Sequence, residues 1–233
     1  MSEVTEEKQT KFDVQETLGK AELFLDQNKK RLGIAAGIVL VLVGGVLAYK
    51  LWWLPKQDEE AQAQIFIAQQ YFEKDSVNLA LNGGTVGGIT VTGLTEIADN
   101  YSGTKSANAA EYMIGVSLLR NGKFEEAIEH LSKFDSDDII LSSVALGAIG
   151  DANMELNRID EAIKFYMKAA DKNTNNFTTP IYLKRAALAY ENQSNYAEAK
   201  KIYERLLKEF GKTNEGREAE KFIARENVLE NQK

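Results

Sequence analysis

His130 is the only histidine in this 233-residue chain, which contains no cysteine. Nucleophilic catalysis of the Ser-His-Asp or Cys-His kind would have to use His130, and a histidine-containing metal site would need it together with carboxylates. Glu125, Glu126 and Glu129 surround it on the same predicted helix, where such charges are usually solvated. We therefore expect a partly exposed surface histidine, and we predict that the chain is not an enzyme and binds no metal or cofactor.

Two further patterns could suggest chemistry. Asp137 and Asp138 are sequence neighbours on a predicted helix surface or turn, which favours solvated charge over acid–base catalysis. The insert 82–92 contains four glycines, but no Lys-Ser/Thr pair follows it and no strand precedes it, as a phosphate-binding loop requires. Because residues 85–92 are the one β-rich stretch, we expect a flexible, hairpin-like loop whose role the sequence does not specify.

An apolar run at residues 32–54 determines how the chain must be placed in the cell. It is 23 residues long and Lys50 is its only charge. As a helix it would reach roughly 34 Å, enough to cross a hydrocarbon core of about 30 Å. A cleaved signal peptide fits poorly, since a 31-residue charged region precedes the run and no A-x-A site follows it. The run predicts an uncleaved transmembrane helix.

The flanks of this segment predict its orientation. Lys29, Lys30 and Arg31 adjoin the N-terminal end, whereas acidic residues soon follow the other end, where Trp52 and Trp53 are suited to the outer headgroups. The basic bias places the N-terminus inside by a margin of about one residue. We therefore expect residues 1–31 to be cytoplasmic, with a short amphipathic helix from residue 13 to 29, and residues 56–233 to be periplasmic in a bacterium.

Small residues follow one face of the predicted membrane helix. Gly33, Gly37, Gly44 and Ala48 fall within a stripe roughly 60° wide at about 100° per residue. A smooth face allows another helix to approach closely, although glycine is also common in membrane helices in general. The stripe is a candidate helix-packing face.

The segment after the apolar run is acidic and helical in pattern. Beyond residue 57 it has 28 acidic and 20 basic residues, a poor match to nucleic acid, so a protein partner is favoured. Pro55 and Pro180 are the only prolines, and a helix is predicted from about residue 57 to 72, after a break at Pro55. Similar hexapeptides recur around Ala127, Ala162 and Ala199, which are 35 and 37 residues apart.

This recurrence resembles the tetratricopeptide repeat, a helix pair with a period of about 34 residues. The family has a small residue at position 8, a large apolar one at 17, alanine at 20, an apolar one at 24 and often alanine at 27. The matching residues are Gly115, Phe124, Ala127, Leu131 and Phe134; Gly150, Ile159, Ala162, Tyr166 and Ala169; and Ala187, Tyr196, Ala199, Tyr203 and Leu206. We expect positions 8 and 20 to let paired helices touch, and larger residues to fill gaps between repeats.

The resemblance implies an all-α solenoid over residues 57–229. Its expected parts are a degenerate repeat at 57–101 that contains the glycine-rich insert, repeats at 108–141, 143–176 and 180–212, and a capping helix at 213–229. All three repeats lack the family's proline at position 32, which leaves the repeat boundaries open.

Repeats of this kind bind partners along a concave wall made by the first helix of each pair. We take the wall candidates to be Tyr112, Val116, Leu119, Asp151, Met154, Lys184, Leu188 and Glu191, with Ala109, Val144, Gly147 and Ile181 at the remaining wall positions. Lysine and asparagine clamps for a terminal carboxylate are represented by Lys184 alone. The wall therefore predicts binding of apolar or extended polypeptide, unless its residues are buried by the first repeat.

A cytoplasmic stub, one membrane helix and periplasmic repeats are together similar in plan to the YfgM-type ancillary subunits of the bacterial Sec translocon. That resemblance implies a chaperone-like adaptor that associates with the SecYEG channel and with a membrane-anchored periplasmic chaperone. The alternative is a scaffold of another envelope machine, for cell-wall assembly, division or secretion. The fold does not separate these two functions.

Overall fold

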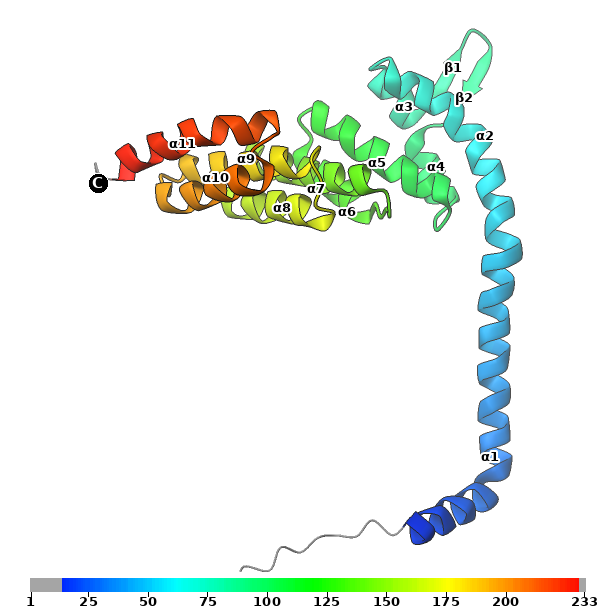
Figure 1. The fold of residues 1–233 in the computed structure, drawn as a ribbon. Helices are drawn as coiled ribbons and strands as arrows, with labels where there is room; N and C mark the ends of the chain where they lie inside the picture. The colour runs from blue at the N-terminus through cyan, green and yellow to red at the C-terminus, as the bar shows by residue number, and fades with distance from the viewer. Residues whose placement is uncertain (1–13, 231–233) are drawn as a thin grey trace, which may run out of the picture. The chain divides into compact units, whose positions relative to one another are not determined.

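The computed structural model describes residues 14–230 and divides the chain into two compact units. The first unit ends at Trp53 and the second begins at Leu54. Nearly all regular structure in the described residues is helical, and the exception is one two-stranded hairpin (Figure 1). The predicted all-α class is confirmed.

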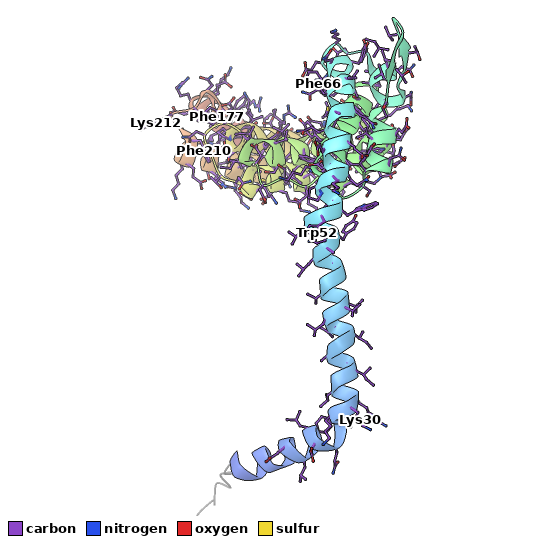
Figure 2. All side chains as sticks on the ribbon, turned by 90° about the vertical axis from the view of Figure 1, so that its right-hand side faces the viewer. Lys30, Trp52, Phe66, Phe177, Phe210 and Lys212 are labelled. Atoms are coloured by element: carbon purple, nitrogen blue, oxygen red, sulfur yellow. The ribbon has the colours of Figure 1, made fainter. Side chains whose placement is uncertain are left out.

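The first unit consists of helix α1 (Val14–Ala48) and a π-helical turn, η1 (Tyr49–Trp53). The sequence predicts a short helix that ends at Lys29; the backbone of α1 stays helical through this point, and Figure 2 shows a bend of the helix near Lys30. Lys29, Lys30 and Arg31 favour helix, and no proline stands between the two segments. Every residue from Arg31 to Trp53 is exposed, and Figure 2 shows the side chains pointing outward between Lys30 and Trp52. Residue 13, where the short helix is predicted to begin, lies outside the described residues.

The π-helical turn lies directly before Pro55. In an α-helix a proline ring clashes with the carbonyl group four residues earlier, which here belongs to Leu51. Because Leu51 is in the wider π turn, the ring gains room. Helix α2 (Leu54–Glu73) follows at once, so the break expected at Pro55 takes the form of a local widening of the helix.

The segment between α2 and the next long helix contains the glycine-rich insert. Helix α3 (Val77–Asn82) precedes the insert, which forms β1 (Gly84–Val86) and β2 (Ile89–Val91), and α4 (Leu94–Asn100) follows. The β-rich stretch is thus an antiparallel hairpin, while the sequence did not indicate α3. Gly83 has φ +70°, and a Cβ at this position would collide with the backbone of Val91 and Gly93. The base of the hairpin therefore requires glycine.

Three helix pairs follow, and then a last helix. The pairs are α5 (Lys105–Arg120) with α6 (Phe124–Lys133), α7 (Ile139–Glu155) with α8 (Ile159–Lys172), and α9 (Thr179–Asn192) with α10 (Tyr196–Phe210). The last helix is α11 (Asn214–Glu230). Each second helix packs on the first helix of the next pair, and α4 packs on α5 in the same way (Figure 1). Helices α2 and α4 thus occupy the place of a preceding pair, and the hairpin lies between them in the sequence.

Each pair turns at one residue with left-handed backbone geometry. Gly122, Asn157 and Ser194 have φ of 74°, 55° and 56°, and each lies two residues before the second helix of its pair. Asp75, just after α2, has φ 52°. Glycine adopts this geometry freely and asparagine tolerates it, so the four turns solve the same steric problem with different residues.

Small residues bring the two helices of a pair into contact. A Cβ added to Gly115 would lie 2.5 Å from Cγ of Leu131, and one added to Gly150 would lie 2.6 Å from Cδ1 of Tyr166. The large residue at position 24 therefore packs over the small residue at position 8 of its own pair. This differs from the expectation that large residues fill gaps between repeats. Ala162, at position 20 of the middle pair, is fully buried.

Candidate protein-binding surface

Three of the wall candidates from α5 and α7 line one open cleft. Leu119, Asp151 and Met154 line a space of about 670 Å³. Arg120, Gly122, Phe124, Glu155, Tyr166 and Arg185 complete the lining. The cleft therefore spans three successive first helices and is bordered by both apolar and charged groups.

Tyr112 lies in a second, smaller cleft. This space of about 250 Å³ is mostly apolar and is lined also by Gln69, Phe72, Ala109, Met113, Phe134 and Leu141. The rings of Tyr112 and Phe134 are 5.1 Å apart, and burial raises the pKa of the Tyr112 hydroxyl although Arg120 opposes this. Val116 is half-buried. With Tyr112 and Leu119 it packs against a cluster of buried residues from α6 and α7, namely Leu131, Ala145, Ala148 and Ile149. Tyr112 and Val116 thus serve the core as well as the wall.

Asp151 is engaged within the chain. The Tyr166 hydroxyl donates a hydrogen bond to Asp151 Oδ1 at 2.7 Å, and the Arg185 guanidinium bonds both carboxylate oxygens. Burial, with the nearby Asp151 charge, raises the pKa of Tyr166, so this hydroxyl remains a neutral donor. Burial likewise raises the pKa of Tyr182, whose ring lies 5.6 Å from the Arg185 guanidinium, to about 12. Asp151 therefore fixes α8 and α9 against α7.

Lys184 and Glu191 are held by the last helix. Lys184 Nζ lies 2.6 Å from Glu218 and 5.4 Å from the Phe222 ring. Glu191 accepts a hydrogen bond from the Tyr203 hydroxyl at 2.6 Å and pairs with Arg225. The charged candidates on α9 are thus bonded to groups of the chain itself.

The remaining wall positions differ in exposure. Leu188 is 43% exposed and Ile181 is 40% exposed, so α9 offers apolar surface. The sequence places Gly147 on the open wall. In the structure it is buried under the Tyr182 ring, where a Cβ would collide, so it does not contribute to an open wall. Gly147 is thus covered by a ring of α9, whereas the sequence-based alternative expects the first repeat to cover part of the wall.

Comparison with known proteins identifies the repeated unit. Two family profiles, both described as tetratricopeptide repeat, match residues 109–137 and 182–213 and residues 144–173. The chain contains tetratricopeptide repeats. Such repeats are protein-interaction modules and are generally non-catalytic, which makes the chain a protein-interaction adaptor.

A solved structure supports the tetratricopeptide fold. It is a crystal structure of nearly identical TPR-like repeats of a candidate kinesin light chain from Podosopora anserina. The two are 14% identical in sequence with a TM-score of 0.52, over 76% of this chain and 89% of the other. At this identity the likeness concerns the fold alone. A comparison with curated proteins gives no match.

The tetratricopeptide period also appears in polar contacts that the sequence reasoning missed. The bonded pairs Asp151–Arg185, Asp171–Arg205 and Lys184–Glu218 are each separated by 34 residues. Opposite charges one repeat apart lie on equivalent turns of corresponding helices in successive repeats, so they meet when the repeats stack. A search for opposite charges at this spacing could have found them.

His130 has a partner that its sequence neighbourhood does not indicate. Its Nδ1 lies 2.6 Å from Glu111 Oε2 on the paired helix α5, and both side chains are mostly buried. The glutamates of its own helix are therefore not its partners. Within residues 14–230 no three histidine or carboxylate side chains gather as a metal site would require. The absence of metal and cofactor remains a prediction.

Proposed function

We propose that the chain is a membrane-anchored, non-enzymatic adaptor of the bacterial inner membrane. In this proposal α1 crosses the membrane once, with the N-terminus in the cytoplasm and the repeats in the periplasm. The adaptor associates with the SecYEG channel and a membrane-anchored periplasmic chaperone, and it assists proteins that emerge from the channel.

One observation carries the anchor. Among the described residues, one helical stretch, Glu22–Glu73, is long and apolar enough to cross a membrane, judged by length and composition. The core helix of a soluble protein would be covered by its own chain, yet none of the most apolar window of this stretch is buried. An exposed apolar surface of this length favours a lipid environment.

The flanks support the orientation and the plan supports the partners. Lys29, Lys30 and Arg31 precede the span, while Trp52 and Trp53 are exposed at its other end. An anchor followed by tetratricopeptide repeats is the plan that the YfgM-type translocon subunits share. The wall supports a polypeptide ligand, because its charged groups Asp151, Lys184 and Glu191 are bonded internally and its open groups are apolar.

Anchor and orientation can be tested together. Alkaline phosphatase, which is active only in the periplasm, is fused after Lys233, and the membranes are extracted with alkaline carbonate. The proposal predicts an active fusion that stays in the carbonate-resistant membrane pellet. A carbonate-soluble protein would contradict the anchor, and an inactive fusion with a protease-shielded repeat unit would contradict the compartment.

A further inference from the structure

The hairpin β1–β2 is a two-stranded sheet that no further strand of the described chain extends. It contains two strands, in the register Gly84 to Val91, Thr85 to Thr90 and Val86 to Ile89, and no third strand joins either edge within residues 14–230. Gly87 and Gly88 connect the strands with φ of 59° and 82°, as a type I′ turn requires.

The register shows which backbone groups face outward. In a hairpin with a two-residue turn, the closing pair exchanges ladder hydrogen bonds and the next pair does not. Val86 and Ile89 are the closing pair, so the N–H and C=O of Thr85 point away from β2. Strand β2 contacts α2, so the open edge is that of β1.

Nothing in the described part of the chain occupies this edge. Outside the ladder, no backbone-to-backbone hydrogen bond there involves residues 84–91. All three residues of β1 are exposed, and in β2 only Val91 is buried. Both views show the hairpin projecting from the neighbouring helices of the second unit (Figures 1 and 2).

Apart from its short length of three residues, the edge lacks the usual protection against pairing. Natural edge strands also carry charges, proline or bulges that prevent another strand from joining. Here no charged residue occurs from Ser76 to Thr95, and the segment has no proline. Val86 and Ile89, 44% and 59% exposed, give the tip apolar side chains. A two-stranded sheet gains stability from packing against a helix, as β2 does on α2, or from a third strand, which the β1 edge could still accept.

We infer that the β1 edge accepts an extended, uncharged segment of an unfolded polypeptide as a third strand. The outward N–H and C=O of Thr85 match another extended backbone, and Val86 and Ile89, which pair across the strands, supply apolar contacts on one face of the hairpin. With no basic residue the hairpin does not attract anionic lipid. This site rests on the proposed adaptor function and adds a second point of capture beside the wall.

The hairpin of a second copy is the competing occupant, and area argues against it. A stable protein interface buries about 1,200 Å² or more in total, which two three-residue strands do not supply. A client segment needs no such area at the hairpin alone, because the wall offers it further contacts. Strand addition to a transient client is therefore the better match.

The experiment measures hydrogen exchange in the full chain held in lipid nanodiscs. The probe is reduced, carboxymethylated α-lactalbumin, a permanently unfolded polypeptide, and its binding is followed separately by fluorescence anisotropy. Exchange in the peptide that covers residues 83–92 should slow about tenfold when the probe is bound. Thr85→Pro removes the outward N–H and no ladder bond, so it should abolish this protection. Thr85→Val, the matched control, keeps the N–H and should preserve it.

Each outcome decides something. Unchanged exchange in residues 83–92 while the probe binds would contradict the hairpin site. Full protection of these residues in Thr85→Pro would contradict it as well. Neither result would contradict the adaptor function. Protection that rises with protein concentration without the probe would assign the edge to a second copy instead. A wild-type chain that binds no probe would contradict the adaptor function itself. Circular dichroism checks that both variants keep their helices.

Discussion

The open part of the wall is apolar because its charged residues already have partners. Asp151 is bonded to Tyr166 and Arg185, and Glu191 to Tyr203 and Arg225. A ligand that sought these carboxylates would first have to break bonds between repeats. The apolar wall residues left for a partner include Leu119, Met154, Ile181 and Leu188. Specificity for a charged peptide terminus is therefore not expected.

Ala162→Leu tests the contact between paired helices. Ala162 is fully buried, and the extra methyl groups have no space in the middle repeat, so we expect a loss of about 1 to 3 kcal/mol in the free energy of unfolding. The matched control is Ala197→Leu, the same change at an exposed position of α10. Thermal denaturation checks the pair. Equal melting temperatures for Ala162→Leu and wild type would show that the repeat register is wrong.

Glu226→Gln tests the buried carboxyl at the end of the solenoid. Glu226 is fully buried and has one oxygen without a partner, and burial raises its pKa although Arg225 opposes this. The folded state then binds more protons than the unfolded state between the two pKa values, so stability falls as pH rises through this window. Glutamine does not titrate. The stability of the variant relative to wild type should therefore increase as the pH rises above the ordinary glutamate pKa of about 4.3.

Urea unfolding of both proteins at several pH values measures this difference. The matched control is Glu220→Gln, an exposed position on the same helix. A difference between wild type and Glu226→Gln that is constant with pH would contradict a raised pKa at this position.

At the scale of elements, helix existence was predictable and polar connections were not. Alanine and large apolar residues recur at repeat spacing, so the three pairs could be read from the sequence, as could the β-rich stretch. The partners of His130, Lys184 and Glu191 lie on other helices and depend on how the repeats stack. A single-helix pattern does not contain this information. Helix α3 escaped prediction because its six residues are too few for a periodic pattern.

The small-residue stripe on α1 can be tested without disturbing the fold. A Cβ added to Gly37 or Gly44 meets no atom within 4 Å, so leucine at both positions should leave the helix intact. If the stripe packs on a partner helix, the double variant should still insert in the membrane but lose that partner.

Mild-detergent purification of the double variant measures this loss. The control double variant, Ile38→Leu with Val46→Leu, changes exposed residues away from the stripe. Recovery of every membrane partner by the stripe variant would show that the stripe is incidental.

The whole molecule joins an apolar helical span to a solenoid of tetratricopeptide repeats. The solenoid alone indicates protein interaction without naming the partner, and the span alone indicates a lipid environment without naming the membrane. In the proposed function, their combination places the chain in a membrane-bound machine that handles polypeptide. Within that setting, the translocon and another envelope complex differ only in the proteins that the chain contacts.

The central claim is tested most directly by identifying what co-purifies with the tagged full chain from solubilised membranes. Three versions are compared: wild type, the wall variant with Leu119, Met154 and Leu188 changed to serine, and a control with the exposed loop residue Phe177 changed to serine. The account predicts that SecYEG subunits and a membrane-anchored periplasmic chaperone co-purify with wild type and the control. The wall variant should lose the chaperone or client while its circular dichroism stays helical. Enrichment of a different envelope complex, or equal recovery by the wall variant, would contradict the account.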